Sequence, residues 1–174
     1  MKRMSFGLTD VGCVRDSNQD SFLIHEEEGL YVVADGMGGH AAGEVASSIA
    51  VKTIHDIMLS GDDPEATVAD MTSCGEDAFV FERMKYAVNR ASQQIQQEAK
   101  RRPSCRGMGT TVVILMVDPT GAYVAHAGDS RAYLIRSEGL RRLTRDHTWV
   151  ADQIRAGLIT EAQAATSQFR NLLT

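Results

Sequence analysis

Alternating apolar and polar positions divide the chain into two groups of strand-like segments, with helical patterns between and after them. Short apolar runs bounded by Gly, Asp, Asn and Ser predict strands. Three such runs come early and four come later: SFGLTDV at 5–11, SFLIHE at 21–26, LYVVAD at 30–35, TTVVILMV at 110–117, AYVAHAG at 122–128, RAYLIR at 131–136 and LRRLT at 140–144. Tight turns such as DPTG at 118–121 join the later runs, which predicts antiparallel pairing.

Helical spacing fills the stretch between these two groups. Apolar residues recur every three to five positions over 41–59, and a second apolar stripe runs from Val80 to about residue 100. Residues 60–78 have the composition of a loop. The tail from residue 148 predicts one or two short helices with a glycine break, then the start of another strand. Grouped strands and grouped helices differ from the alternation of a doubly wound parallel sheet, so the predicted class is α+β.

Length, composition and charge narrow the function classes. The 174 residues predict one domain over 1–174, and 43% hydrophobic with 24% charged residues is typical of a globular protein. A net charge of -5 argues against nucleic acid or an anionic membrane as the main partner, so KRRPSCR at 100–106 is interpreted as a solvated loop. The longest apolar run, 112–117, is too short to span a bilayer, and no signal segment is evident, which predicts a cytoplasmic protein. Cys13, Cys74 and Cys105 form no CxxC pair and indicate reduced thiols.

The glycine loop after LYVVAD allows three interpretations. GMGGHA at 36–41 matches a dinucleotide-binding fingerprint, but Asp35 would face the pyrophosphate, and no second parallel strand ending in an acid follows the helix. Asp35 could instead cap the helix, although the helix is expected to begin only near residue 41. A carboxylate at the end of a buried strand more readily indicates a cation partner, with the neighbouring glycine carbonyl as a second oxygen ligand. Oxygen ligands of this kind favour magnesium or manganese.

Further charged residues stand at similar positions. Arg15 lies five residues before Asp20, just ahead of a predicted strand, and Asp129 lies in the turn of a predicted hairpin. Each alone has an ordinary explanation, as a surface arginine or a turn aspartate. Together, an arginine fork for phosphate and several aspartates at strand ends indicate metal-assisted phosphoryl chemistry.

Five ordered motifs carry a family resemblance that covers about residues 6–174: GCVRDSNQDSF at 12–22, LYVVADGMGGHAAGEVAS at 30–47, GMGTTVV at 107–113, AHAGDSRAYLIR at 125–136 and LTRDHTWV at 143–150. In this order they resemble the bacterial branch of the metal-dependent protein phosphatase 2C family. The resemblance implies an antiparallel β-sandwich flanked by helices in α-β-β-α layers. It also implies two Mn²⁺ or Mg²⁺ ions, with a third in bacterial members, and hydrolysis of phosphoserine and phosphothreonine on proteins by a metal-activated water.

The resemblance also assigns roles to single residues. By family likeness Asp35 bridges two metals, the Gly36 carbonyl binds one of them, and Asp20 holds a metal-bound water. Arg15 would clamp the substrate phosphate, and Asp129 would help to hold the third metal. His40 is a candidate proton donor to the leaving alkoxide, because an imidazole titrates near neutral pH. A loop histidine that only hydrogen-bonds the backbone is an equally open alternative.

The sequence also departs from the family pattern. Gln19 stands where some relatives have glutamate, and Ser167 and Gln168 stand where relatives often place His-Pro. Family members continue with an Asp-Gly and an Asp-Asn segment that complete the metal site, and this chain ends before both. It is therefore expected to be a domain incomplete at its C-terminus: a fragment of an enzyme, a chain that borrows strands from a partner, or a non-catalytic remnant.

The leading hypothesis is a protein serine/threonine phosphatase that acts on phosphorylated proteins and is opposed by a serine/threonine protein kinase. The alternative is a catalytically silent phosphoprotein-binding module of the same fold. A dinucleotide-binding oxidoreductase is a distant third hypothesis, which nicotinamide cofactor binding would revive.

Overall fold

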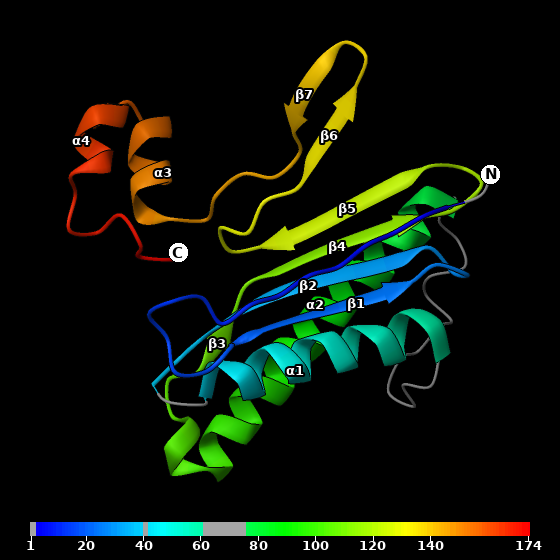
Figure 1. Ribbon diagram of the computed structural model, residues 1–174, viewed down its shortest axis with the longest axis horizontal. Coiled ribbons are helices and arrows are strands. Elements are labelled where there is room, and N and C mark those ends of the chain that lie inside the picture. Colours follow the sequence, from blue (N-terminus) through cyan, green and yellow to red (C-terminus); the bar gives the residue numbers. More distant parts are fainter. Residues whose placement is uncertain (1–2, 40–41, 61–75) are drawn as a thin grey trace. The chain divides into compact units, whose positions relative to one another are not determined.

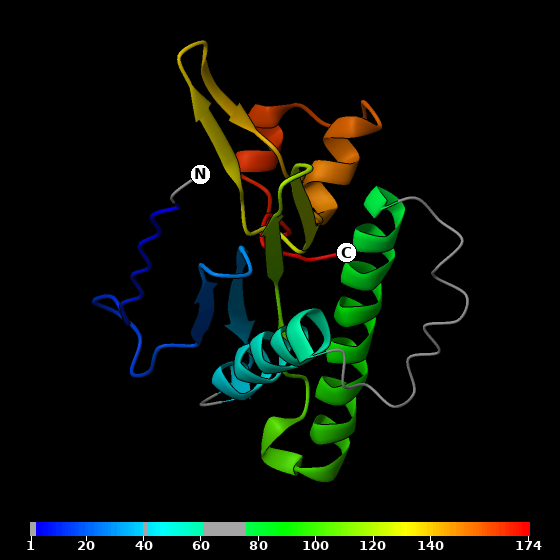
Figure 2. The same ribbon diagram turned by 90° about the vertical axis from the view of Figure 1, so that its right-hand side faces the viewer.

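The computed structural model describes residues 3–39, 42–60 and 76–174 (Figures 1 and 2). His40, Cys74 and most of the loop expected at 60–78 lie outside the described residues. The chain divides into two compact units, residues 1–125 and 126–174.

An antiparallel sheet forms the centre of the first unit. Its strands follow the order β1-β2-β4-β5, and β3 pairs with β2 beyond Asp35. The strands are β1 (Asp20–His25), β2 (Leu30–Met37), β3 (Gly109–Thr110), β4 (Val112–Val117) and β5 (Ala122–Ala127). Antiparallel strands grouped around a pair of helices confirm the predicted α+β class.

Two helices cover one face of this sheet. α1 (Ala42–His55) lies along β1 and β2 and packs against α2 (Glu76–Arg101), as Figure 2 shows. The sheet residues turned toward the helices are almost fully buried: Leu30, Val32, Ala34 and Ile114 are each no more than 1% exposed. On α2 the buried side chains recur at helical spacing, at Met84, Ala87, Ala91 and Ile95. Both predicted helices are thus confirmed. In the described ranges, none is long and apolar enough to cross a membrane.

The end of the first helix differs from the expected continuous helix over 41–59. After His55 the chain forms a π-helical turn, η1 (Asp56–Ser60). Arg83 of α2 donates hydrogen bonds to the Ile57 carbonyl oxygen from Nε at 3.0 Å and from Nη2 at 2.7 Å. A carbonyl in a widened turn can accept such bonds from outside its own helix, and the periodicity of apolar residues carries no sign of that partner.

Residues 5–11 were expected to form a strand, and that prediction is wrong. The segment has no strand pairing and lies against the other face of the sheet, where Gly7 is in close contact with the ring of Phe22. Ser5 is fixed instead by its N–H, which donates to Glu26 Oε1 at 2.8 Å. Phe22 and Val33 face each other across β1 and β2 and are 39% and 51% exposed. This sheet face is therefore apolar but only partly covered.

The start of α1 approaches β2 closely because both segments have a glycine at the contact. A Cβ on Gly36 would collide with the Gly43 carbonyl oxygen and would lie 2.5 Å from the Gln19 carbonyl oxygen. A Cβ on Gly43 would lie 2.8 Å from the carbonyl carbon of Gly36. The Gln19 carbonyl accepts hydrogen bonds from Gly36 N–H at 3.1 Å and from Ser47 Oγ at 2.7 Å. Strand, helix and the loop before β1 therefore meet at one point.

The second unit contains a hairpin and two short helices. The hairpin joins β6 (Tyr133–Arg136) to β7 (Gly139–Arg142), and α3 (Trp149–Arg155) and α4 (Glu161–Ala165) follow. Both helices begin with a capping threonine, and Thr160 forms a full capping box with Gln163. The pairing of the runs predicted at 131–136 and 140–144 and the tail helices are confirmed. The hairpin predicted around Asp129 is not formed, because β5 pairs with β4 and β6 pairs with β7. The strand expected near the end is a single bridge between Thr148 and Leu173.

Asp146 ties the hairpin to the chain before it. Arg131 donates to its carboxylate from Nε at 3.2 Å and from Nη2 at 2.7 Å, and Arg142 also donates to it. Burial raises the pKa of Asp146, but the two arginines outweigh that effect and hold the pKa below its usual value. The same hydrogen bonds raise the pKa of Arg131. Asp146 is therefore ionised at neutral pH.

Gly36→Ala should destabilise the first unit by about 2 kcal/mol or more, because a methyl group cannot fit between two carbonyl groups without moving α1. The control is Gly39→Ala, where an added Cβ meets nothing within 4 Å. Urea unfolding followed by far-ultraviolet circular dichroism measures both variants. Equal stability of the two would contradict the close packing of α1 on β2.

Asp146→Asn should destabilise the second unit by about 1 kcal/mol at pH 7, since charged hydrogen bonds are lost. Because the folded-state pKa is depressed, this contribution is present above the unfolded pKa of about 3.9 and is lost as the pH falls through the folded value. The gap between wild type and variant should thus close in acid. Fluorescence of Trp149, the single tryptophan, reports on this unit. The control is Asp152→Asn, whose partner Arg155 is more exposed than Arg131 and Arg142. A stability difference between wild type and Asp146→Asn that stays constant with pH would refute the account.

Candidate functional site

Two carboxylates face each other at one end of the sheet in the first unit. The antiparallel register pairs Asp20 at the start of β1 with Asp35 near the end of β2. Residues directly opposite on antiparallel strands project from the same face, and here that face is the one turned away from α1. Both residues are exposed. Like charges in this arrangement repel, so a cation at this position would stabilise the pair.

The main chain of Asp35 is fixed by two threonines that precede β4. Asp35 N–H donates to Thr111 Oγ1 at 3.1 Å, and its carbonyl oxygen accepts from Thr111 N–H at 2.9 Å and from Thr110 Oγ1 at 3.0 Å. On the opposing strand, Asp20 N–H donates to Asn18 Oδ1 at 3.0 Å. Both carboxylates are therefore carried by backbone with little freedom to move apart.

The residues at this position suit a hard divalent cation. Asp20 and Asp35 supply carboxylate oxygens from an exposed sheet face, and the Gly36 carbonyl lies next in the chain. Magnesium and manganese prefer such oxygen ligands. In the described parts of the chain, His, Cys, Asp and Glu side chains form no cluster of three or more that could hold a metal ion. The facing pair therefore supplies only part of the ligand set expected from the sequence.

Arg15 lies in the loop before β1. Its side chain is exposed, and within the described residues it has no hydrogen-bond or ion-pair partner. A guanidinium in that condition can offer its full fork of donors to a phosphate. His40, the candidate proton donor, lies outside the described residues. Its two interpretations both stay open.

Asp129 belongs to the second unit, whereas Asp20 and Asp35 belong to the first. It is half-buried in a turn that opens with Gly128, whose φ of 99° is a conformation that favours glycine. His147 closes this turn with two bonds: its N–H donates to the Gly128 carbonyl at 3.1 Å, and its Nδ1 accepts from Gly128 N–H at 3.3 Å. His147 therefore has a structural role in this turn.

The analysis of the sequence gave His126 no role, but the structure places it in a histidine pair. The rings of His126 and His147 lie 4.6 Å apart, and His126 Nε2 accepts from Arg145 N–H at 3.3 Å. Desolvation, His147 and then Arg142 lower the pKa of His126, although Asp146 opposes them. A neutral His126 can accept that bond, whereas a protonated one cannot.

Gly43 and Ser47 support the site, and the predictions from the sequence did not include them. Gly43 and Ser47 hold the start of α1 to the Gln19 carbonyl and Gly36. Their sequence signal is the run of small residues in AAGEVASS at 41–48, which allows a helix to approach a strand closely.

Comparison with known proteins places this geometry in a family. A sequence model described as Protein phosphatase 2C matches residues 14–171. Among characterised relatives, "Serine/threonine phosphatase stp" of Listeria welshimeri serovar 6b is 34% identical over 168 residues, which cover 95% of this chain and 63% of the relative. The chain thus spans less than two thirds of the length of that relative.

Solved structures agree with this match. The S. agalactiae serine/threonine phosphatase superposes with a TM-score of 0.79 at 30% identity, over 96% of this chain and 65% of that one. The catalytic domain of the serine/threonine protein phosphatase PstP in complex with two manganese ions gives a TM-score of 0.68 at 32% identity, over 88% of this chain and 60% of that one. The matched region includes the strands that carry Asp20 and Asp35, and the chain belongs to the protein phosphatase 2C family.

Proposed function

We propose that the protein hydrolyses phosphoserine and phosphothreonine on other proteins and that it requires divalent metal. The observation that carries the proposal is the pairing of Asp20 with Asp35 on adjacent strands. Two like charges on a fixed backbone are unfavourable by themselves and favourable around a cation. The manganese in the related PstP structure and the phosphatase named in Listeria support the same chemistry.

In this proposal Asp20, Asp35 and the Gly36 carbonyl would hold the metal, and Asp129 is the candidate ligand of a third metal ion. When bound, a metal pair lowers the pKa of a water and neutralises charge on the phosphoryl oxygens. Arg15 binds two phosphate oxygens through its fork and orients the phosphorus for in-line attack. His40 is the candidate donor of the proton that the leaving serine or threonine alkoxide takes up.

The partners follow from this activity. The substrates would be phosphorylated proteins, and a serine/threonine protein kinase would oppose the reaction. We place the enzyme in the cytoplasm, where the exposed free thiol of Cys13 would stay reduced. Manganese and magnesium both suit the oxygen ligands, and either could serve.

Phosphate release from a phosphothreonine peptide in Mn²⁺ tests the proposal. Asp35→Asn and Asp20→Asn should each lower kcat/KM by about a hundredfold or more, because each removes a charged ligand. Asp152→Asn, an exposed carboxylate on α3, should leave it unchanged. Tight binding of the peptide without phosphate release, in Mn²⁺ or in Mg²⁺, would favour the catalytically silent phosphoprotein-binding module. It would defeat the phosphatase proposal.

Arg15→Lys should raise KM for the phosphopeptide by about tenfold, because a lysine ammonium cannot reproduce the bidentate fork. Inhibition by inorganic phosphate should weaken in parallel, and this readout does not depend on the leaving group. Arg155→Lys on α3 is the matched control. An unchanged KM and an unchanged phosphate inhibition constant would remove Arg15 from the site.

A further inference from the structure

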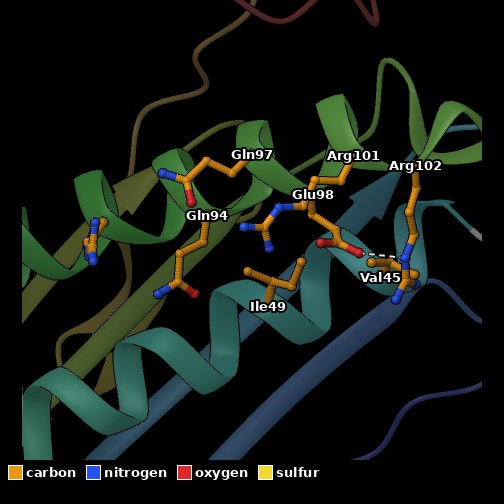
Figure 3. Close-up of a pocket in the computed structure, with 8 residues that line it drawn as sticks. Val45, Ile49, Gln94, Gln97, Glu98, Arg101 and Arg102 are labelled. Carbon is orange, nitrogen blue, oxygen red and sulfur yellow. Dashed lines mark ion pairs between the residues drawn. The ribbon is translucent and has the colours of Figure 1, made fainter.

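A groove runs between the two helices of the first unit. It has a volume of about 440 Å³, and Figure 3 shows the residues that line it. Val45 and Ile49 of α1 form an apolar side that packs against the buried core. The other side consists of polar and charged residues from α2 and its C-terminal end: Arg90, Gln94, Gln97, Glu98, Arg101 and Arg102. The groove therefore joins an aliphatic strip to a row of long polar side chains.

The α2 side of the groove follows one helical stripe. Arg90, Gln94, Gln97 and Arg101 recur at spacings of four, three and four residues, which places them in a row beside the buried stripe. Arg90 and Arg101 are about 16 Å apart along the helix axis at 1.5 Å per residue. An extended segment of about five residues spans the same length.

The charge of this groove is opposite to that of the whole chain. Three arginines and one glutamate line it, while the chain has a net charge of -5. Arg102 Nε pairs with Glu98 Oε1 at 2.6 Å. Arg101 is exposed and has no hydrogen-bond or ion-pair partner in the part of the chain that the structure describes. Lys100 and Arg106 are further basic residues close to Arg101 in the sequence.

We propose that this groove binds an acidic segment of a protein partner, with an aliphatic side chain against Val45 and Ile49 and carboxylates against Arg90 and Arg101. The inference rests on the proposed function, in that the partner is a phosphoprotein substrate recognised away from its phosphorylated residue. α1 covers one face of the sheet, and Asp20 and Asp35 project from the other. A segment bound in the groove would thus raise affinity without entering the reaction site.

An acidic peptide fits the groove better than a nucleic acid does. A nucleic acid would need a basic surface that follows its backbone and aromatic groups that stack on its bases. The groove has a short row of arginines, an aliphatic strip and no aromatic lining residue in the described set. Charge complementarity with a net-negative segment supplies orientation and speed of association, and burial of the aliphatic side chain supplies specificity.

Fluorescence anisotropy of a labelled, unphosphorylated peptide of Asp, Glu and Leu tests this inference without any catalysis. Arg101→Glu should weaken binding by about tenfold, because an attractive pair becomes a repulsive one. Lys85→Glu makes the same charge change on the opposite side of α2 and should have no effect beyond about twofold. Replacing Leu by Ser in the peptide should also weaken binding. A peptide in which Lys replaces one Asp or Glu should bind the Arg101→Glu variant more tightly than the original peptide does.

Absence of binding to the wild type, or equal loss with Arg101→Glu and Lys85→Glu, would overturn the inference. So would a single-stranded oligonucleotide that binds more tightly than the acidic peptide. For the active protein, Arg101→Glu should raise KM for a phosphopeptide joined to the acidic segment and leave kcat for p-nitrophenyl phosphate unchanged. Peptide binding without turnover would contradict the phosphatase proposal while the groove assignment stands.

Discussion

The antiparallel register of β1 and β2 places Asp20 opposite Asp35, and most of the local structure serves to keep that pair in place. Two exposed like charges at facing positions would cost up to about 1 kcal/mol. A slip of the strands would relieve this repulsion, but the six residue pairs of β1 and β2 and the bond from Gly36 N–H to the Gln19 carbonyl fix the register. Thr110 and Thr111 also bind the backbone of Asp35. The fold therefore holds two carboxylates at facing positions, an arrangement that a bound cation would stabilise.

The end of β2 has two roles, because it packs against α1 and also contains the expected metal ligands. Gly36 must lack a side chain because α1 approaches β2 there, and it directly follows Asp35 in the chain. In the second unit, Asp146 and His147 play a comparable part by bonding Arg131 and Gly128 on either side of Asp129. Side chains next to Asp129 thus fix its position by bonding the residues on either side of it.

The sequence alone indicated the α+β class, both helices and the facing strands, because apolar periodicity is strong in those segments. It failed for residues 5–11, which form no strand pairing: Gly7 lies against Phe22, while the apolar side chains of Phe6 and Leu8 are exposed. It also gave no sign of the π-helical turn, since that turn depends on Arg83, distant in sequence. The motifs named Asp20 and Asp35, but only the register shows that they face each other. The groove between α1 and α2 could not be predicted from the sequence, because it depends on how the two helices pack against each other.

The most direct test of a cation between Asp20 and Asp35 is the stability of Asp35→Asn relative to wild type, measured by urea unfolding in EDTA and again in Mn²⁺. In EDTA the variant should be at least as stable as wild type, because one of two repelling charges is gone. In Mn²⁺ it should be the less stable protein, since metal binding then favours the folded wild type. The same difference in both solutions would contradict the account, because the pair would then have no preference for a cation.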